Sequence, residues 1–253
     1  MRNKLTDELA VCGYNAVKAL AEVHPKNINR LFLREDRLPD FSGLCKKLAE
    51  RKRPYKICLD EELERVCKSS HHQGVAAMIY NPEVAPAAED DIEAWAAGGK
   101  TCLLLCDVGN DHNLGAIIRS AAFFDAAAAV LTEGTELSTS AYRVAEGGME
   151  HILFRRVRNP AAFLRAAGRR LVTVGADPRA RIRIRDLPPL VREKSADGKR
   201  AGVILALGNE ETGLPEDVKE NCSLLARIPG AGVIESLNVS QAASLFLHEL
   251  YEM

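Results

Sequence analysis

Apolar residues recur along this chain in two spacings, one typical of amphipathic helices and one typical of buried strands. In the first 80 residues, strand-like runs occur at Ile28 to Leu33, Tyr55 to Leu59 and Val75 to Tyr80. Helical spacing covers Asp7 to Val23, Phe41 to Lys52 and Glu61 to Cys67. This alternation predicts a small α/β module with a mostly parallel, layered sheet.

Residues 81–99 differ from what precedes them. They contain two prolines, an acidic cluster and a terminal Gly98-Gly99, a composition typical of a linker. We therefore predict a first domain over residues 1–80, a linker over residues 81–99 and a second domain over residues 100–253.

The second domain repeats the alternation with longer and more apolar strands. Strands are predicted to begin at Thr101, Ala127, Arg170, Gly202 and Leu224, and helices at Asn113, Pro160, Glu216 and Ser240. Fully apolar strands indicate a parallel sheet that is covered on both faces. Ligands of such sheets bind beyond the carboxyl ends of the strands.

The composition indicates the cellular compartment and excludes some classes of site. The chain has 253 residues, 47% of them hydrophobic, and no apolar run approaches the length of a membrane span. The N-terminus lacks the apolar core of a signal peptide. The seven cysteines form no C-x-x-C pair, and His248-Glu249 opens no H-E-x-x-H motif. We expect a cytoplasmic protein with no membrane segment and no metal site.

Charge is distributed unevenly although the net charge is only −1. Residues 151–200 contain 14 basic and 4 acidic residues, a net charge of +10. Such a segment either contacts nucleic-acid phosphates or forms a solvated, arginine-rich face, and composition alone favours neither.

Two glycine-containing loops follow predicted strands. The loop Leu207 to Gly213 has the spacing G-x-x-x-x-G, but Leu214-Pro215 replace the Lys-Ser/Thr of a phosphate-binding loop and two glutamates lie inside it. Gly230-Ala-Gly232 lacks the third glycine of a dinucleotide fingerprint. These departures exclude a nucleoside triphosphatase and weaken a dinucleotide site, leaving an ordinary strand-to-helix turn as the alternative for each loop.

Polar candidates lie at the starts of two predicted helices. Ser236 and Asn238 precede the last helix, and Asn113 is expected to cap the helix that contains Arg119. Arg119 is otherwise a surface arginine, and the stretch with Arg143, Glu146 and Glu150 is otherwise a polar loop.

Three segments together resemble the SpoU branch of the SPOUT methyltransferases, the TrmH-like RNA ribose 2′-O-methyltransferases. They are N-L-G-A-I-I-R at 113–119, L-G-N-E-x-x-G at 207–213 and I-P-x-x-G-x-x-x-S-L-N-V-S at 228–240. Residues 11–18 and 72–76 are similar to the L30e-like substrate-binding module that precedes this domain in many members. The layout resembles the 23S rRNA guanosine 2′-O-methyltransferase subgroup.

The resemblance implies an α/β SPOUT domain with a deep trefoil knot, a homodimer through that domain, and RNA (rRNA or tRNA) as the partner. It implies S-adenosyl-L-methionine as the cofactor, bound by backbone around Gly208, Ile228 and Leu237. It places Asn113, Arg119, Glu210, Ser236 and Asn238 at the reacting end, where Arg119 acts either as general base or as phosphate clamp. The alternative function is an RNA-binding or ribosome-assembly protein with an inactive SPOUT domain.

Overall fold

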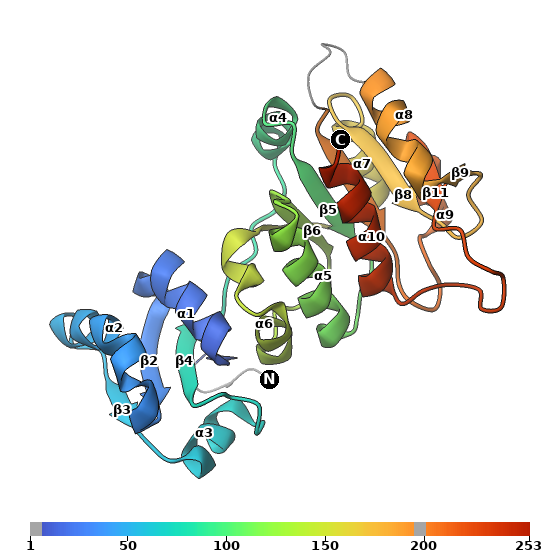
Figure 1. The fold of residues 1–253 in the computed structure, drawn as a ribbon. Helices are drawn as coiled ribbons and strands as arrows, with labels where there is room; N and C mark the ends of the chain where they lie inside the picture. Colours follow the sequence, from blue (N-terminus) through green and yellow to red (C-terminus); the bar gives the residue numbers. More distant parts are fainter. Residues whose placement is uncertain (1–6, 195–200) are drawn as a thin grey trace. The chain divides into compact units, whose positions relative to one another are not determined.

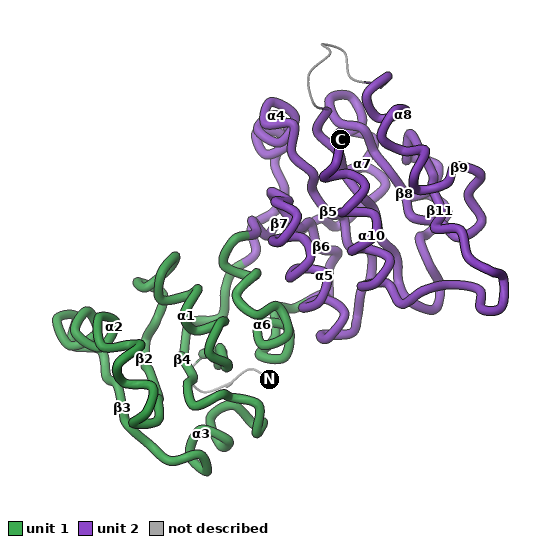
Figure 2. The backbone as a smooth tube through the Cα atoms, in the orientation of Figure 1, with its two compact units in different colours: residues 1–83, 136–151 green, residues 84–135, 152–253 purple. Residues whose placement is uncertain are grey.

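The computed structural model of the chain describes residues 7–194 and 201–253, which form two compact units (Figure 2). Unit 1 contains residues 1–83 and 136–151, and unit 2 contains residues 84–135 and 152–253. The chain therefore passes between the units at three points, not at one linker. The end of the basic stretch, 195–200, lies outside the described residues.

Unit 1 is built on a four-stranded sheet in the order β1 (Glu8–Cys12), β4 (Val75–Tyr80), β2 (Ile28–Leu33) and β3 (Tyr55–Ile57). β4 is antiparallel to both neighbours and only the β2–β3 pair is parallel, so the expected mostly parallel sheet is wrong here. The predicted helix at 7–23 is also wrong in its first part. All five residues of β1 are buried, and α1 (Tyr14–Val23) begins only after Gly13, whose φ is +104°.

Two further helices complete the first part of unit 1, namely α2 (Leu38–Glu50) and α3 (Asp60–Cys67). The segment 136–151 adds α6 (Thr139–Ala145), which packs on β1, and a 3₁₀ turn at Gly148–His151, which packs on α1. Glu146 accepts a hydrogen bond from the Asn15 amide at 2.6 Å, and Glu150 lies 2.7 Å from the His24 ring. These glutamates thus have partners in α1 and at its C-cap residue, and this stretch is not merely a polar loop.

In its described residues, unit 2 contains seven parallel strands. This arrangement confirms the α/β class (Figure 1). Their order is β7 (Leu153–Val157), β6 (Ala128–Thr132), β5 (Thr101–Leu105), β10 (Val203–Leu207), β8 (Val172–Ala176), β11 (Leu224–Arg227) and β9 (Ile182–Arg183). Helices α4 (Glu89–Ala97), α7 (Pro160–Ala167) and α9 (Glu216–Glu220) share one core with alternate residues of β5, β6 and β10. Helices α5 (Asp111–Phe123) and α10 (Val239–Tyr251) pack together and over the central strands, and α8 (Leu187–Glu193) packs against α10.

The predicted linker at 81–99 is wrong over most of its length. Helix α4 occupies its second half, and Ile92 and Trp95 are buried in the core of unit 2. Residues 85–87 extend the sheet beyond β7, because the Arg156 amide donates to Ala85 and the Ala87 amide donates to Arg156, both at 2.9 Å. A chain that began at Gly99 would lack part of this core. Within the described residues no helix is long and apolar enough to cross a bilayer.

Candidate functional site

The first motif lies in α5, and the second and third form the loops after β10 and β11; together these segments are called the motif loops. They lie at one edge of the unit 2 sheet, since they follow the parallel strands β5, β10 and β11. Helix α5 begins one turn earlier than expected. Its N-cap is Asn110, whose side chain accepts from the His112 amide at 2.8 Å, so the prediction of Asn113 as the cap is wrong. The side chain of Asn113 is therefore available for contacts with the other two loops.

Asn113, Glu210 and Asn238 form a hydrogen-bonded chain that links all three motifs. The side-chain nitrogen of Asn113 donates to the Glu210 carboxylate, and the side-chain oxygen of Asn113 accepts from the side-chain nitrogen of Asn238 at 3.0 Å. The side-chain oxygen of Asn238 caps α10 by accepting from the backbone N–H of Ser240 at 2.9 Å and from the Ser240 hydroxyl at 2.6 Å. Each amide orientation is thus fixed by its neighbours, which leaves Glu210 as an exposed carboxylate on an ordered support.

The loop 208–214 is closed by a residue that sequence reasoning missed. The Asn209 carbonyl oxygen accepts from the Glu211 amide at 2.9 Å and from the Thr212 amide at 3.2 Å. Its amide nitrogen donates to the Asp107 carbonyl at 2.9 Å, which joins this loop to the one that follows β5. An asparagine beside a glycine after a strand is a signal for this kind of side-chain turn, and it could have identified Asn209.

The loop after β11 is open to solvent. Residues 229–238 are all exposed, including the apolar side chains Val233 (89%) and Ile234 (71%). A Cβ atom at Gly230 or Gly232 would meet nothing within 4 Å. Ile228 is half-buried and Leu237 is exposed. Exposed apolar side chains next to accessible backbone are suited to packing against a flat, partly apolar ligand such as a nucleoside.

Two of the predicted site residues are not brought into the hydrogen-bonded chain. Arg119 is exposed on α5, six residues beyond Asn113, and it forms no hydrogen bond or ion pair with the described residues. Ser236 is exposed in the loop after β11 and likewise has no polar partner in the described part of the chain. Both are free to contact a substrate.

A family model described as the SpoU rRNA Methylase family matches residues 100–248. The chain belongs to this family. The match confirms the resemblance drawn from the three motifs and identifies the protein as a methyltransferase. A second model, described as RNA 2′-O ribose methyltransferase substrate binding, matches residues 10–85.

Curated relatives of this SpoU family member match over nearly all of its length. A protein of Acinetobacter baylyi named 23S rRNA (guanosine-2′-O-)-methyltransferase RlmB is 30% identical, over 94% of both chains. A protein of Escherichia coli O157:H7 named uncharacterized tRNA/rRNA methyltransferase YfiF is 29% identical, over 98% of this chain and 69% of its own.

Solved structures share the fold. The AdoMet-bound rRNA methyltransferase from Sinorhizobium meliloti superposes with a TM-score of 0.75 at 23% identity, over 98% of this chain and 88% of that one. The SpoU methyltransferase AviRb from Streptomyces viridochromogenes in complex with AdoMet gives a TM-score of 0.71 at 23% identity, over 98% and 91%.

The cysteine beside the motif loops of this SpoU family member is not equipped for covalent chemistry. Burial raises the pKa of the Cys106 thiol to about 12, so the thiol stays protonated at neutral pH. Among the described residues, no three His, Cys, Asp or Glu side chains are grouped to hold a metal ion. The polar groups available for chemistry at this edge are the carboxylate, amide, hydroxyl and guanidinium groups of the three motifs.

Proposed function

We propose that this SpoU family protein methylates a ribose 2′-hydroxyl of structured RNA, with S-adenosylmethionine as the methyl donor and rRNA rather than tRNA as the substrate. The observation that supports this most is the hydrogen-bonded chain Glu210–Asn113–Asn238, which joins three motifs separated by up to 125 residues. The 23S rRNA activity in the name of the Acinetobacter baylyi relative favours rRNA.

The cofactor would be held by the loops after β10 and β11, with backbone around Gly208, Ile228 and Leu237. Support comes from the accessible glycines and exposed apolar side chains of the second loop and from AdoMet in two solved structures of the same fold. When bound, this cofactor supplies an electrophilic methyl group. We further propose that this region forms the deep trefoil knot of the family, which sequence periodicity does not reveal.

The residues of this chain would position the hydroxyl and assist loss of its proton. Glu210, held by Asn113, and Ser236 supply acceptors at the reacting end. We assign Arg119 to a phosphate clamp that also stabilises developing negative charge, because a guanidinium does not give up its proton readily and is a poor base. Its lack of a polar partner among residues 7–194 and 201–253 is consistent with a group reserved for substrate.

Unit 1 would select the RNA through an L30e-like module. The match of residues 10–85 to a substrate-binding family supports this role, as does a surplus of basic over acidic residues, 15 against 11, in residues 1–80. Free cysteines, six of the seven buried, fit the reducing conditions of the cytoplasm.

The face formed by α5 and α10 would hold the homodimer. Phe123 is 80% exposed there, and its ring lies 5.0 Å from that of Phe124, which in turn contacts His248 and Tyr251. An exposed aromatic cluster of this kind is typical of an interface.

The function is tested by comparing RNA from a strain that lacks this protein with RNA from its parent. Mapping of 2′-O-methyl groups should show one modification missing from the rRNA of the deletion strain and restored by the wild-type gene. S-adenosylmethionine should also raise the melting temperature of the purified protein. Unchanged methylation together with no thermal shift would favour the alternative, an assembly protein with an inactive domain.

A further inference from the structure

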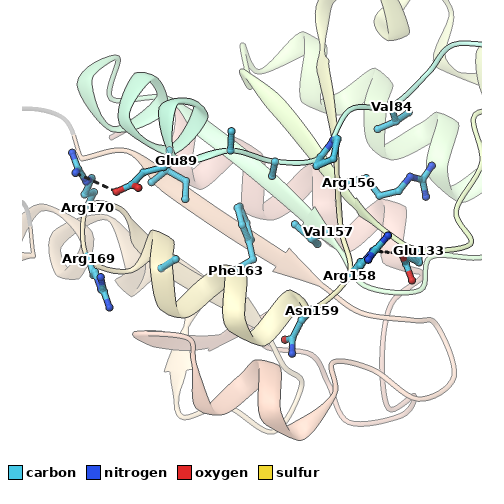
Figure 3. Close-up of a pocket in the computed structure, with 15 residues that line it drawn as sticks. Val84, Glu89, Glu133, Arg156, Val157, Arg158, Asn159, Phe163, Arg169 and Arg170 are labelled. Carbon is cyan, nitrogen blue, oxygen red and sulfur yellow. Dashed lines mark hydrogen bonds and ion pairs between the residues drawn. The ribbon is translucent and has the colours of Figure 1, made fainter.

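A groove in unit 2 lies away from the motif loops. Its volume is about 730 Å³, and none of the residues at the ends of β5, β10 or β11 line it. One wall is the extended segment 84–88, which runs along β7, and the other is α7 (Figure 3). The floor is apolar and includes Ile92, Val157 and Phe163. An apolar lining with a few polar groups near it is typical of a ligand site.

Arginines stand at both ends of this groove. Figure 3 shows Arg169 and Arg170 at one end and Arg156 and Arg158 at the other, with Phe163 between them. Eight residues of α7 separate the two ends, which corresponds to about 12 Å. Four arginines line the groove against two glutamates, and residues 151–170 contain six arginines and no acidic residue. The groove therefore presents guanidinium groups at two separated points.

The four arginines are not equally available. Arg156 donates to the carbonyls of Thr132 and Thr135 at 3.1 and 2.9 Å, so its guanidinium is structural. Arg158 pairs with Glu133 at 3.1 Å, but its side chain is 91% exposed, and such a surface pair is weak enough to exchange for another anion.

At the opposite end Arg170 lies 2.8 Å from Glu93 and 3.7 Å from Glu89, so its charge is already matched. Arg169 is exposed and has no ion pair among the described residues. Arg158 and Arg169 are thus the two guanidinium groups, one at each end, that can take new partners.

We propose that this groove binds a single-stranded segment of the RNA, with phosphates at Arg158 and Arg169 and a base against the floor at Phe163. The proposal rests on RNA being the substrate. A single phosphate group could not reach both ends, whereas an RNA strand has phosphates at intervals with apolar base faces between them. The groove would be a second RNA contact, separate from unit 1 and from the motif loops.

The test uses the full-length protein, a fluorescein-labelled oligouridine and fluorescence anisotropy at several salt concentrations. Arg158→Ala with Arg169→Ala should weaken binding and lower the slope of log K against log salt by about 1.4, since each single-strand phosphate contact contributes about 0.7. Ala166→Glu places a negative charge in the groove at an exposed helical position and should weaken binding about five- to tenfold. The matched control is Ala94→Glu, because Ala94 is exposed on α4 and does not line the groove.

The outcomes separate this inference from the proposed function. Loss of affinity in both groove variants, with wild-type binding by Ala94→Glu and an unchanged thermal shift with S-adenosylmethionine, would support the groove even if no methylated RNA were found. Wild-type affinity and salt slope in both groove variants would overturn it, whether or not the protein methylates RNA. Binding of an acidic peptide, such as oligoglutamate, in place of the oligouridine would also overturn it.

Discussion

Replacing Gly208 by alanine tests the geometry on which the proposed cofactor site depends. An added Cβ atom would lie 2.2 Å from the carbonyl carbon of Gly213, 2.3 Å from its oxygen and 2.3 Å from the Leu214 nitrogen. Non-bonded carbon contacts are favourable at about 3.5–4.0 Å, so the loop would have to open by more than 1 Å. The atoms that it would meet belong to the backbone and cannot rotate away.

The expected cost is about 1–3 kcal/mol, the usual range for an overpacked site. In a protein of this size, each kcal/mol lowers the melting temperature by roughly 2–4 °C, so the variant should melt about 2–12 °C lower. Opening the loop also displaces Asn209 and Glu210, so S-adenosylmethionine should no longer raise the melting temperature.

Thermal denaturation with and without S-adenosylmethionine measures both effects. Gly109→Ala is the matched control, because a Cβ atom there would meet nothing within 4 Å, and this variant should keep the cofactor-induced shift. If Gly208→Ala kept the wild-type melting temperature and the full shift, the closed loop would not be needed for cofactor binding.

Arg119→Ala should abolish methylation but leave the melting temperature and the cofactor-induced shift unchanged, because the Arg119 guanidinium has no partner in the described protein. Arg119→Lys should also abolish methylation. Normal methylation by the alanine variant would refute the role of Arg119 as a phosphate clamp. Asp91→Asn should lower the free energy of unfolding at pH 7 by about 2–3 kcal/mol, because Asp91 accepts two hydrogen bonds from Arg155 at 2.8 and 2.9 Å. Since Arg155 lowers the pKa of Asp91, this difference should persist above pH ~4 and disappear as the pH falls through the lowered value; a difference independent of pH in chemical denaturation would contradict it. Phe123→Asp should yield a monomer in light scattering, and an unchanged dimer mass would argue against the α5–α10 interface.

The sequence predicted strands correctly where every residue of the strand is buried. The strands of unit 2 at β5, β6 and β10 are buried at every residue, so their apolar runs have few alternative structures. Their parallel arrangement then brings the loops that follow them to one edge, which is why Asn113 and Glu210 could be expected to meet across 97 residues.

Prediction from the sequence failed where one spacing of apolar residues fits both a helix and a strand, or where the interacting residue is far away in the sequence. Leu9 and Val11 fit the helical period of α1, but they lie on β1 because the chain turns at Gly13. Strand β7 was missed because its sequence contains Arg155 and Arg156, whose guanidinium groups bond to remote groups at the sheet edge. Helix α4 was hidden by the prolines and acidic residues around it.

The assignment of the segment 136–151 to unit 1 also could not be predicted from the sequence. It depends on contacts between Asn15 and Glu146 and between His24 and Glu150, which are more than 120 residues apart in each case. The spacing of apolar residues along the sequence does not indicate such distant pairs, and resemblance to a family with the same domain order does not identify them either.

The most direct test of the proposed function is methyl transfer in vitro. Purified protein would be incubated with methyl-labelled S-adenosylmethionine and rRNA from the deletion strain, and the RNA digested to nucleosides for mass spectrometry. We predict label in one 2′-O-methylated nucleoside with the wild-type protein and none with Arg119→Ala. Label confined to a base, or no transfer to any RNA from that strain, would contradict the assignment of this protein as a ribose 2′-O-methyltransferase.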